Sequence, residues 1–86
     1  MNDLLKNLDK LRTTELGIMR IRKNLNLEAG DVVGWCGRKI TEADRIIKKG
    51  KNWYIYYGGS VLTVNARSYT IITAHKIDRK LRRAKI

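Results

Sequence analysis

The sequence predicts an α+β domain, in which three to four N-terminal helices precede a three-stranded antiparallel β-meander and a basic C-terminal tail or short helix. Two observations lead to this fold. The first half carries leucines and isoleucines at helical spacing, and residues 51–76 are rich in β-branched and aromatic residues around a Gly-Gly pair. At 86 residues the chain can bury one small hydrophobic core. We therefore expect a single domain over residues 1–76, with residues 77–86 as the tail.

Periodicity and capping residues set the bounds of the first two expected helices. The first should begin at Asn2 or Asp3 and run through Arg12. Thr13 is the expected N-cap of a second helix that runs to about Leu25. The apolar side of this second helix should bury Leu16, Ile18 or Met19, Ile21 or Arg22, and Leu25.

Two further helical segments are expected before the sheet. Asp31 is a good N-cap for a third helix over residues 32–40. Thr41 should cap another helical turn, which carries two isoleucines and ends at Gly50 as the C′ residue. These segments should cover one face of the meander.

The strongest local signal in the chain is a hairpin centred on Gly58-Gly59. The two glycines tolerate the positive φ that a two-residue turn between twisted strands requires. With this loop, Tyr57 pairs with Ser60 and the register continues to a pair between Trp53 and Val64. Side chains alternate along a strand, so the register predicts two faces. The core face holds Trp53, Ile55, Leu62 and Val64, and the opposite face holds Tyr54, Tyr56, Val61 and Thr63.

A second turn at residues 65–68 should lead into the third strand. A tight return there places Tyr69 opposite Val64. The same parity puts Thr73 and His75 on the core face, near the point where a covering helix would end. His75 and the tyrosine-bearing face therefore lie on opposite sides of the sheet, unless the last strand bulges or bends.

Charge is the strongest global property of the chain, with a net charge of +11. Residues 1–45 contain nine Lys or Arg and seven Asp or Glu, whereas residues 46–86 contain ten and one. Such a field is typical of a protein that binds a polyanion, and nucleic acid is the commonest one. An acidic protein or ribonucleoprotein partner is the alternative. The oligomeric state does not follow from the sequence.

Several other classes of protein are disfavoured. No apolar run approaches the length of a membrane span, and the N-terminal leucines are interleaved with charges unlike those of a secretory signal. We therefore expect a cytoplasmic protein without membrane contact. One cysteine and one histidine provide no cluster of zinc ligands, so neither a metal nor a cofactor is expected.

Tyr54 and Tyr56 form an aromatic pair on which unpaired bases could stack. The alternative is that the two rings cover a second hydrophobic surface, such as that of a helix or a dimer partner. Basic residues from several segments are the candidate phosphate contacts. They are Arg20, Lys23, Lys51, Arg67 and Lys76, together with Arg79, Lys80, Arg82 and Arg83 in the tail.

His75 is the candidate acid or base for a metal-independent ribonuclease, with Thr73 two residues before it. Such a reaction also needs a cation near the phosphate. Arg67 would lie about 25 Å away along a straight strand, so Arg20 or Lys23 on the second helix is the expected source. The alternative is that His75 is a polar surface residue or a phosphate contact.

Four segments carry a resemblance to a known family. They are TTELGIMRIRKNLNL (13–27), DVVGWCGRKI (31–40), GKNWYIYY (50–57) and VNARSYTIITAHK (64–76). Together they resemble an uncharacterised family of small bacterial and phage proteins, a domain of unknown function. The resemblance covers about residues 4–76 and implies no activity.

A second resemblance covers residues 41–76, where a hairpin precedes a hydrophobic strand that ends in YTIITAHK. This arrangement is similar to the last strands of compact ribonuclease toxins of the RelE, barnase and colicin D type. The leading hypothesis is a nucleic-acid-binding protein of a phage or mobile element, most of all for RNA, which would be a toxin-like ribonuclease if His75 is catalytic. The alternative is a non-catalytic inhibitor or regulator that binds a host nucleic-acid-processing complex.

Overall fold

A computed structural model describes residues 3–28 and 30–77 of the chain. Over these residues, helices precede a four-stranded antiparallel sheet with the strand order β1-β2-β3-β4. The helical elements are α1 (Asp3–Lys6), the short 3₁₀ helix η1 (Leu8–Lys10), α2 (Glu15–Leu25) and α3 (Val32–Thr41). The strands are β1 (Arg45–Lys49), β2 (Asn52–Tyr57), β3 (Ser60–Asn65) and β4 (Ile71–Lys76). The α+β class is thus confirmed, and the expected number of strands was one too low.

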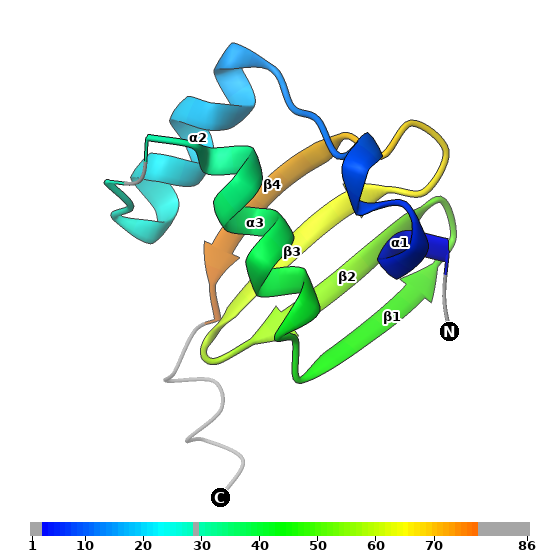
Figure 1. Cartoon of the computed structure of the whole chain (residues 1–86). Helices are drawn as coiled ribbons and strands as arrows, with labels where there is room; N and C mark the ends of the chain where they lie inside the picture. The colour runs from blue at the N-terminus through cyan, green and yellow to red at the C-terminus, as the bar shows by residue number, and fades with distance from the viewer. Residues whose placement is uncertain (1–2, 29, 78–86) are drawn as a thin grey trace, which may run out of the picture.

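The hydrophobic core lies between the helices and one face of the sheet, because α1, α2 and α3 all lie on the same side (Figure 1). The helical layer contributes Leu4, Leu11, Ile21, Val32, Cys36 and Ile40. The sheet contributes Trp53, Ile55, Leu62, Val64, Ile71 and Ala74. The core face predicted for the central hairpin is confirmed. None of the described helices has the length and apolar character needed to cross a membrane.

The central hairpin between β2 and β3 has the predicted register, from Tyr57 opposite Ser60 to Trp53 opposite Val64. Gly58 has a φ of 53°, a conformation that a side chain disfavours. The Gly58 amide also donates a 2.9 Å hydrogen bond to Oδ2 of Asp44, which joins this turn to the residue before β1. The two-residue turn therefore sets the register between β2 and β3.

The helical turn predicted for residues 41–50 is wrong, because Arg45–Lys49 forms β1 and pairs with β2. Two adjacent isoleucines favour an extended backbone, and a single isolated helical turn has little stability of its own. Gly50 has a φ of 62° in the tight turn between β1 and β2. The C′ position of a helix and this hairpin turn both favour a residue with a positive φ. Gly50 was therefore compatible with the predicted helix end as well as with the observed turn.

The first helix is shorter than predicted, because the chain is extended at Arg12 to pair with the sheet. The Arg12 amide donates to the Tyr69 carbonyl at 3.1 Å, and the Ile71 amide donates to the Arg12 carbonyl at 2.7 Å. Thr13, the expected N-cap of the next helix, instead donates its hydroxyl to the Ile71 carbonyl at 2.9 Å. The N-cap is Thr14, whose hydroxyl accepts from an amide of the first turn.

The predicted apolar side of helix α2 is confirmed except at Leu16, which is 55% exposed. Ile21 is fully buried, and Ile18 and Leu25 pack against the core. Of the alternatives Ile18 and Met19, Ile18 therefore faces inward, and Met19 is 66% exposed. Helix α2 lies beside β4 (Figure 1), and Nδ2 of Asn24 donates to the Ala74 carbonyl at 3.1 Å. A polar hydrogen bond to the sheet edge thus helps to determine which side of this helix faces inward. The third helix, capped by Asp31, is confirmed.

Strand β4 contains a β-bulge that changes which residues face the core. Val64 is opposite Ile71, but Thr63 is opposite Thr73, so Ile72 is an extra residue between the two pairs. The predicted pairing of Tyr69 with Val64 is wrong, because Tyr69 lies in the preceding loop with a φ of 60°. Beyond the bulge, the parity of the strand is the reverse of the predicted one.

The new parity places Ala74 opposite Leu62 in the core and His75 opposite Val61 on the other face. Ala74 is fully buried and His75 is exposed. The predicted position of Thr73 and His75 on the helix-covered face is therefore wrong. A bulge depends on how the strand packs against β3 and α2, which alternation within the strand does not reveal.

Candidate functional site

The side of the sheet turned away from the helices is called the open face here, since no described helix covers it (Figure 1). The strand register defines its members as three rows that cross the sheet. The rows are Arg45–Tyr56–Val61–His75, Ile47–Tyr54–Thr63–Thr73 and Lys49–Asn52–Asn65.

The open face has an aromatic centre and a cationic margin along β1. Tyr54 and Tyr56 are partly buried beside Val61 and Thr63, which are 7% and 8% exposed. Arg45 and Lys49 on β1 are exposed, as is His75 on β4. None of the eleven residues in the three rows is acidic. The face therefore combines ring surfaces with uncompensated positive charge.

The bulge in β4 brings His75 onto the same face as the two tyrosines. The row that contains His75 runs across all four strands. The backbones of Arg45 and His75 are therefore three strand spacings apart, which is about 14 Å. This distance suits two contacts along one extended ligand and is too large for both residues to hold a single phosphate. His75 and the tyrosines were candidates from the sequence, which placed them on opposite faces unless the last strand bulged or bent.

The reason for expecting Arg20 or Lys23 to supply a cation to His75 does not hold in the structure. Arg20 and Lys23 were favoured because His75 was expected on the helix-covered face, and His75 lies on the open face. Both basic residues are exposed on α2, beside β4. Lys76 is also exposed, but its register position opposite Ser60 directs it to the other side of the sheet from His75.

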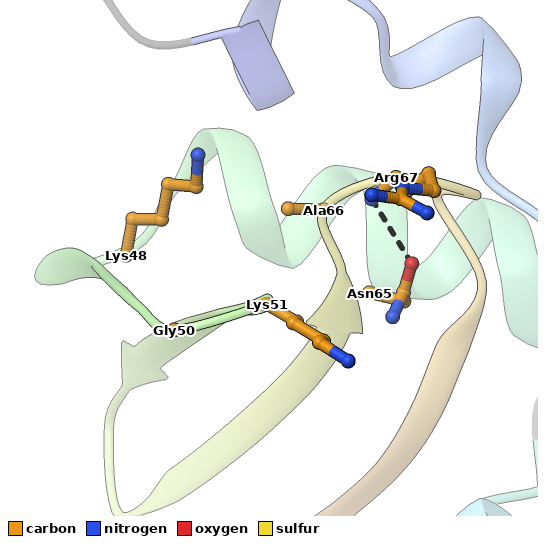
Figure 2. Close-up of a pocket in the computed structure, with 6 residues that line it drawn as sticks. All are labelled: Lys48, Gly50, Lys51, Asn65, Ala66 and Arg67. Atoms are coloured by element: carbon orange, nitrogen blue, oxygen red, sulfur yellow. Dashed lines mark hydrogen bonds between the residues drawn. The ribbon is translucent and has the colours of Figure 1, made fainter.

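A second basic site lies at the end of the sheet where β1 turns into β2. Lys51 in this turn and Arg67 in the loop after β3 line a hollow of about 530 Å³, together with Lys48 (Figure 2). The Ala66 amide donates to the Lys51 carbonyl at 2.8 Å, which holds the two turns together. Arg67 and His75 are at opposite ends of β4, as the sequence predicted.

Lys48 was not among the predicted site residues, because residues 48–50 were interpreted as the end of a helix. The signal was nevertheless present in the sequence KKGK, where Gly50 separates three lysines. A hairpin turn through this glycine brings Lys48 and Lys51 to one end of the sheet. Recognition of β1 would therefore have placed Lys48 near Lys51.

A family model for a protein of unknown function (DUF3781) matches residues 5–75. The chain belongs to the DUF3781 family. No curated protein and no solved structure matches this chain. The predicted membership of an uncharacterised family is thus shown, and the resemblance to ribonuclease toxins finds no support.

In this DUF3781 chain, the described residues contain no group of three or more His, Cys, Asp or Glu side chains that could hold a metal ion. Cys36 is buried, and burial raises the pKa of its thiol to about 12. Burial also raises the pKa of Tyr57 to about 12. Both groups are therefore neutral near pH 7, and Cys36 packs in the core as a small apolar side chain.

The predicted phosphate contacts of the tail lie outside the described residues of the DUF3781 chain. They are Arg79, Lys80, Arg82 and Arg83. At the end of the described chain, the Ile77 amide donates to the Gly59 carbonyl at 2.7 Å. The chain therefore enters the tail beside the turn between β2 and β3.

Proposed function

We propose that this DUF3781 protein binds single-stranded nucleic acid, RNA above all, on the open face of its sheet. The observation that carries the proposal is the pair Tyr54 and Tyr56 beside the exposed cations of β1, on a face without carboxylates. A catalytic role for His75 is not needed for binding and stays a prediction of the sequence.

The tyrosine pair would supply the sequence-tolerant part of the affinity. A base stacked on an aromatic side chain contributes about 1–3 kcal/mol, and every base has a π-face. Tyr54 and Tyr56 are two residues apart on β2, which places both rings on the open face about 7 Å apart along the strand. Successive unpaired bases can therefore stack along β2.

The side chains at the margins would contact the phosphates on either side of the stacked bases. Arg45 lies on β1 and His75 on β4, so the backbone of a bound strand meets one of them on each side of the aromatic centre. The net charge of +11 adds a long-range attraction that accelerates the encounter. The hydroxyl of Thr73 in the second row can hydrogen-bond to a 2′-hydroxyl group, which favours RNA over DNA.

The proposal is tested by fluorescence anisotropy with a labelled single-stranded RNA at fixed salt. Tyr54→Ala and Tyr56→Ala should each weaken binding by about 1–3 kcal/mol, which is roughly 5- to 150-fold in Kd. Tyr56→Phe is the matched control, because it keeps the ring and removes the hydroxyl. It should bind nearly as tightly as the wild type. A duplex of the same sequence should bind more weakly, because its bases are not free to stack.

Salt dependence separates stacking from charge. Arg45→Ala should lower the slope of log K against log salt by about 0.7, the value for one lost phosphate contact to a single strand, whereas the tyrosine variants should leave the slope unchanged. Arg38 provides the control, since it is exposed on α3 and outside the open face. If both alanine variants of the tyrosines bind like the wild type, the proposal is wrong and an acidic protein partner becomes the better hypothesis.

A further inference from the structure

The hollow at the turn between β1 and β2 has a charge that one internal phosphate does not match. Lys48, Lys51 and Arg67 carry three positive charges around it, and none of its six lining residues is acidic. No carboxylate among the described residues forms an ion pair with any of the three. An internal phosphodiester carries one negative charge, whereas a terminal phosphate monoester carries about −1.5 to −2 near pH 7.

The backbone of the hollow leaves room for a ligand. Gly50 has a φ of 62°, and a Cβ atom built there would meet no other atom within 4 Å. Lys48 and Lys51 extend from either side of Gly50, and Arg67 belongs to the neighbouring loop (Figure 2). Lysine and arginine side chains are long and have several rotatable bonds, so their head groups can turn toward an anion bound between the two turns.

The hollow is continuous with the open face through the third row of that face. Asn65 lines the hollow and is also opposite Asn52 in this row, next to Lys49. The side chain of Asn65 accepts hydrogen bonds from the amides of Arg67 and Ser68, at 3.0 and 2.9 Å, which fixes the loop that carries Arg67. A strand that follows the tyrosines toward this end of the sheet therefore arrives at the hollow.

We propose that the hollow binds the terminal phosphate monoester of the nucleic-acid strand, so that the protein recognises a phosphorylated strand end. The proposal rests on the proposed function of the open face. The bases stack on Tyr54 and Tyr56, and the end of the strand places its dianionic phosphate between Lys51 and Arg67. Lys48 lines the hollow from the helix side of the sheet and adds a third charge.

The test compares three RNAs of one sequence that differ only at their ends, with a 5′-phosphate, a 3′-phosphate or hydroxyls at both ends. One phosphorylated RNA should bind at least about tenfold more tightly than the hydroxyl-ended RNA, since hydrogen bonds to charged groups are strong. Which of the two does so gives the polarity of the bound strand. Equal affinity for all three RNAs would overturn the proposal.

The variants Lys51→Ala and Arg67→Ala assign the effect to the hollow. Both side chains are exposed, so the two variants should melt within a few degrees of the wild type. In each variant the ratio of the Kd of the hydroxyl-ended RNA to that of the phosphorylated RNA should fall several-fold. Arg38→Ala removes one charge near the end of α3, at the other end of the sheet, and should keep the full preference.

The outcomes separate this proposal from the proposed function. If the alanine variants of the tyrosines weaken binding of the hydroxyl-ended RNA but no RNA end is preferred, the open face binds RNA and the hollow does not recognise its end. If a preference exists but persists in Lys51→Ala and Arg67→Ala, the terminal phosphate binds elsewhere and the proposal for the hollow is wrong. If the tyrosine variants have no effect while the hollow variants abolish the preference, the proposed function fails and the phosphate site remains.

Discussion

The bulge in β4 can be tested with two lysine substitutions at neighbouring positions, Ala74→Lys and His75→Lys. The structure places Ala74 opposite Leu62 in the core, with no exposed surface, and His75 opposite Val61 on the open face. In a strand without the bulge, the two positions would exchange faces. The same new side chain should therefore have opposite consequences at the two positions.

The expected magnitudes differ by several kcal/mol. A domain of this size has a free energy of unfolding of about 4–13 kcal/mol. An ammonium group buried at Ala74 without a partner carries an effective desolvation penalty of several kcal/mol, which is a large part of that total. An exposed substitution such as His75→Lys usually changes the free energy of unfolding by about 0.5 kcal/mol or less.

Thermal melts followed by circular dichroism provide the assay. For a domain of 60–100 residues, each kcal/mol shifts Tm by about 4–8 °C. His75→Lys should therefore melt within about 4 °C of the wild type, and Ala74→Lys should lose well over 10 °C or fail to fold. Ala74→Leu is a milder variant, which should cost about 1–3 kcal/mol by overpacking. A stable Ala74→Lys together with an unfolded His75→Lys would show that β4 has no bulge and that His75 faces the helices.

Three further predictions concern the core and the turns. In urea titrations, the free energy of unfolding should fall as the pH rises from 9 toward 12, because burial raises the pKa of Cys36 from 9.0, and that of Tyr57 from 10.0, to about 12 in the folded state. As the pH rises, the unfolded chain releases these protons before the folded chain does, so the stabilisation is complete below pH 9. Cys36 alone accounts for a loss of up to about 4 kcal/mol in the free energy of unfolding. Cys36→Ala should therefore make the free energy of unfolding fall less steeply with pH. Gly58→Ala should cost about 1 kcal/mol in the same titrations because its φ is 53°, whereas Gly59→Ala, which has open space and no positive φ, should cost clearly less. Ile21→Ala should cost about 2–5 kcal/mol and Leu16→Ala less than about 1 kcal/mol, since the first side chain is fully buried and the second is 55% exposed; equal losses would contradict the orientation of α2.

Local chemistry explains which parts of the fold could be predicted. Gly58-Gly59 and the flanking aromatic residues determine the central register without help from the rest of the chain, and the structure has that register. Asp31 likewise caps α3 through a 2.9 Å bond from the Gly34 amide. Both features depend on residues within a few positions of one another.

The errors arose where distant parts of the chain decide the structure. Residues 45–49 form a strand because the edge of β2 is available to pair with them, and their own pattern is ambiguous between helix and strand. The helix before α2 ends early because Arg12 pairs with the loop and strand around residue 70. The bulge at Ile72 follows from the packing of β4 between β3 and α2. The residue pattern within each segment does not reveal these contacts with distant parts of the chain.

The positions of the candidate residues depend on both kinds of contact. Tyr54 and Tyr56 share one face as predicted, because they belong to the hairpin with the strongest local signal. The face of His75 was predicted wrongly, because it depends on the bulge. Lys51 and Arg67 were candidates and line the hollow, whereas Lys48 was interpreted as part of a helix end.

The most direct measurement of the central claim is a titration of isotope-labelled protein with hydroxyl-ended single-stranded RNA, followed through the aromatic ¹³C–¹H signals. The chain has four tyrosines and one histidine. Tyr54 and Tyr56 lie on the open face, whereas Tyr57 and Tyr69 contact Trp35 and Trp53 at ring-centroid distances of 5.6 and 5.5 Å. We expect the ring signals of Tyr54, Tyr56 and His75 to shift together as RNA is added, and those of Tyr57 and Tyr69 to stay in place. Shifts confined to Tyr57 and Tyr69, or no shift at saturating RNA, would contradict binding on the open face.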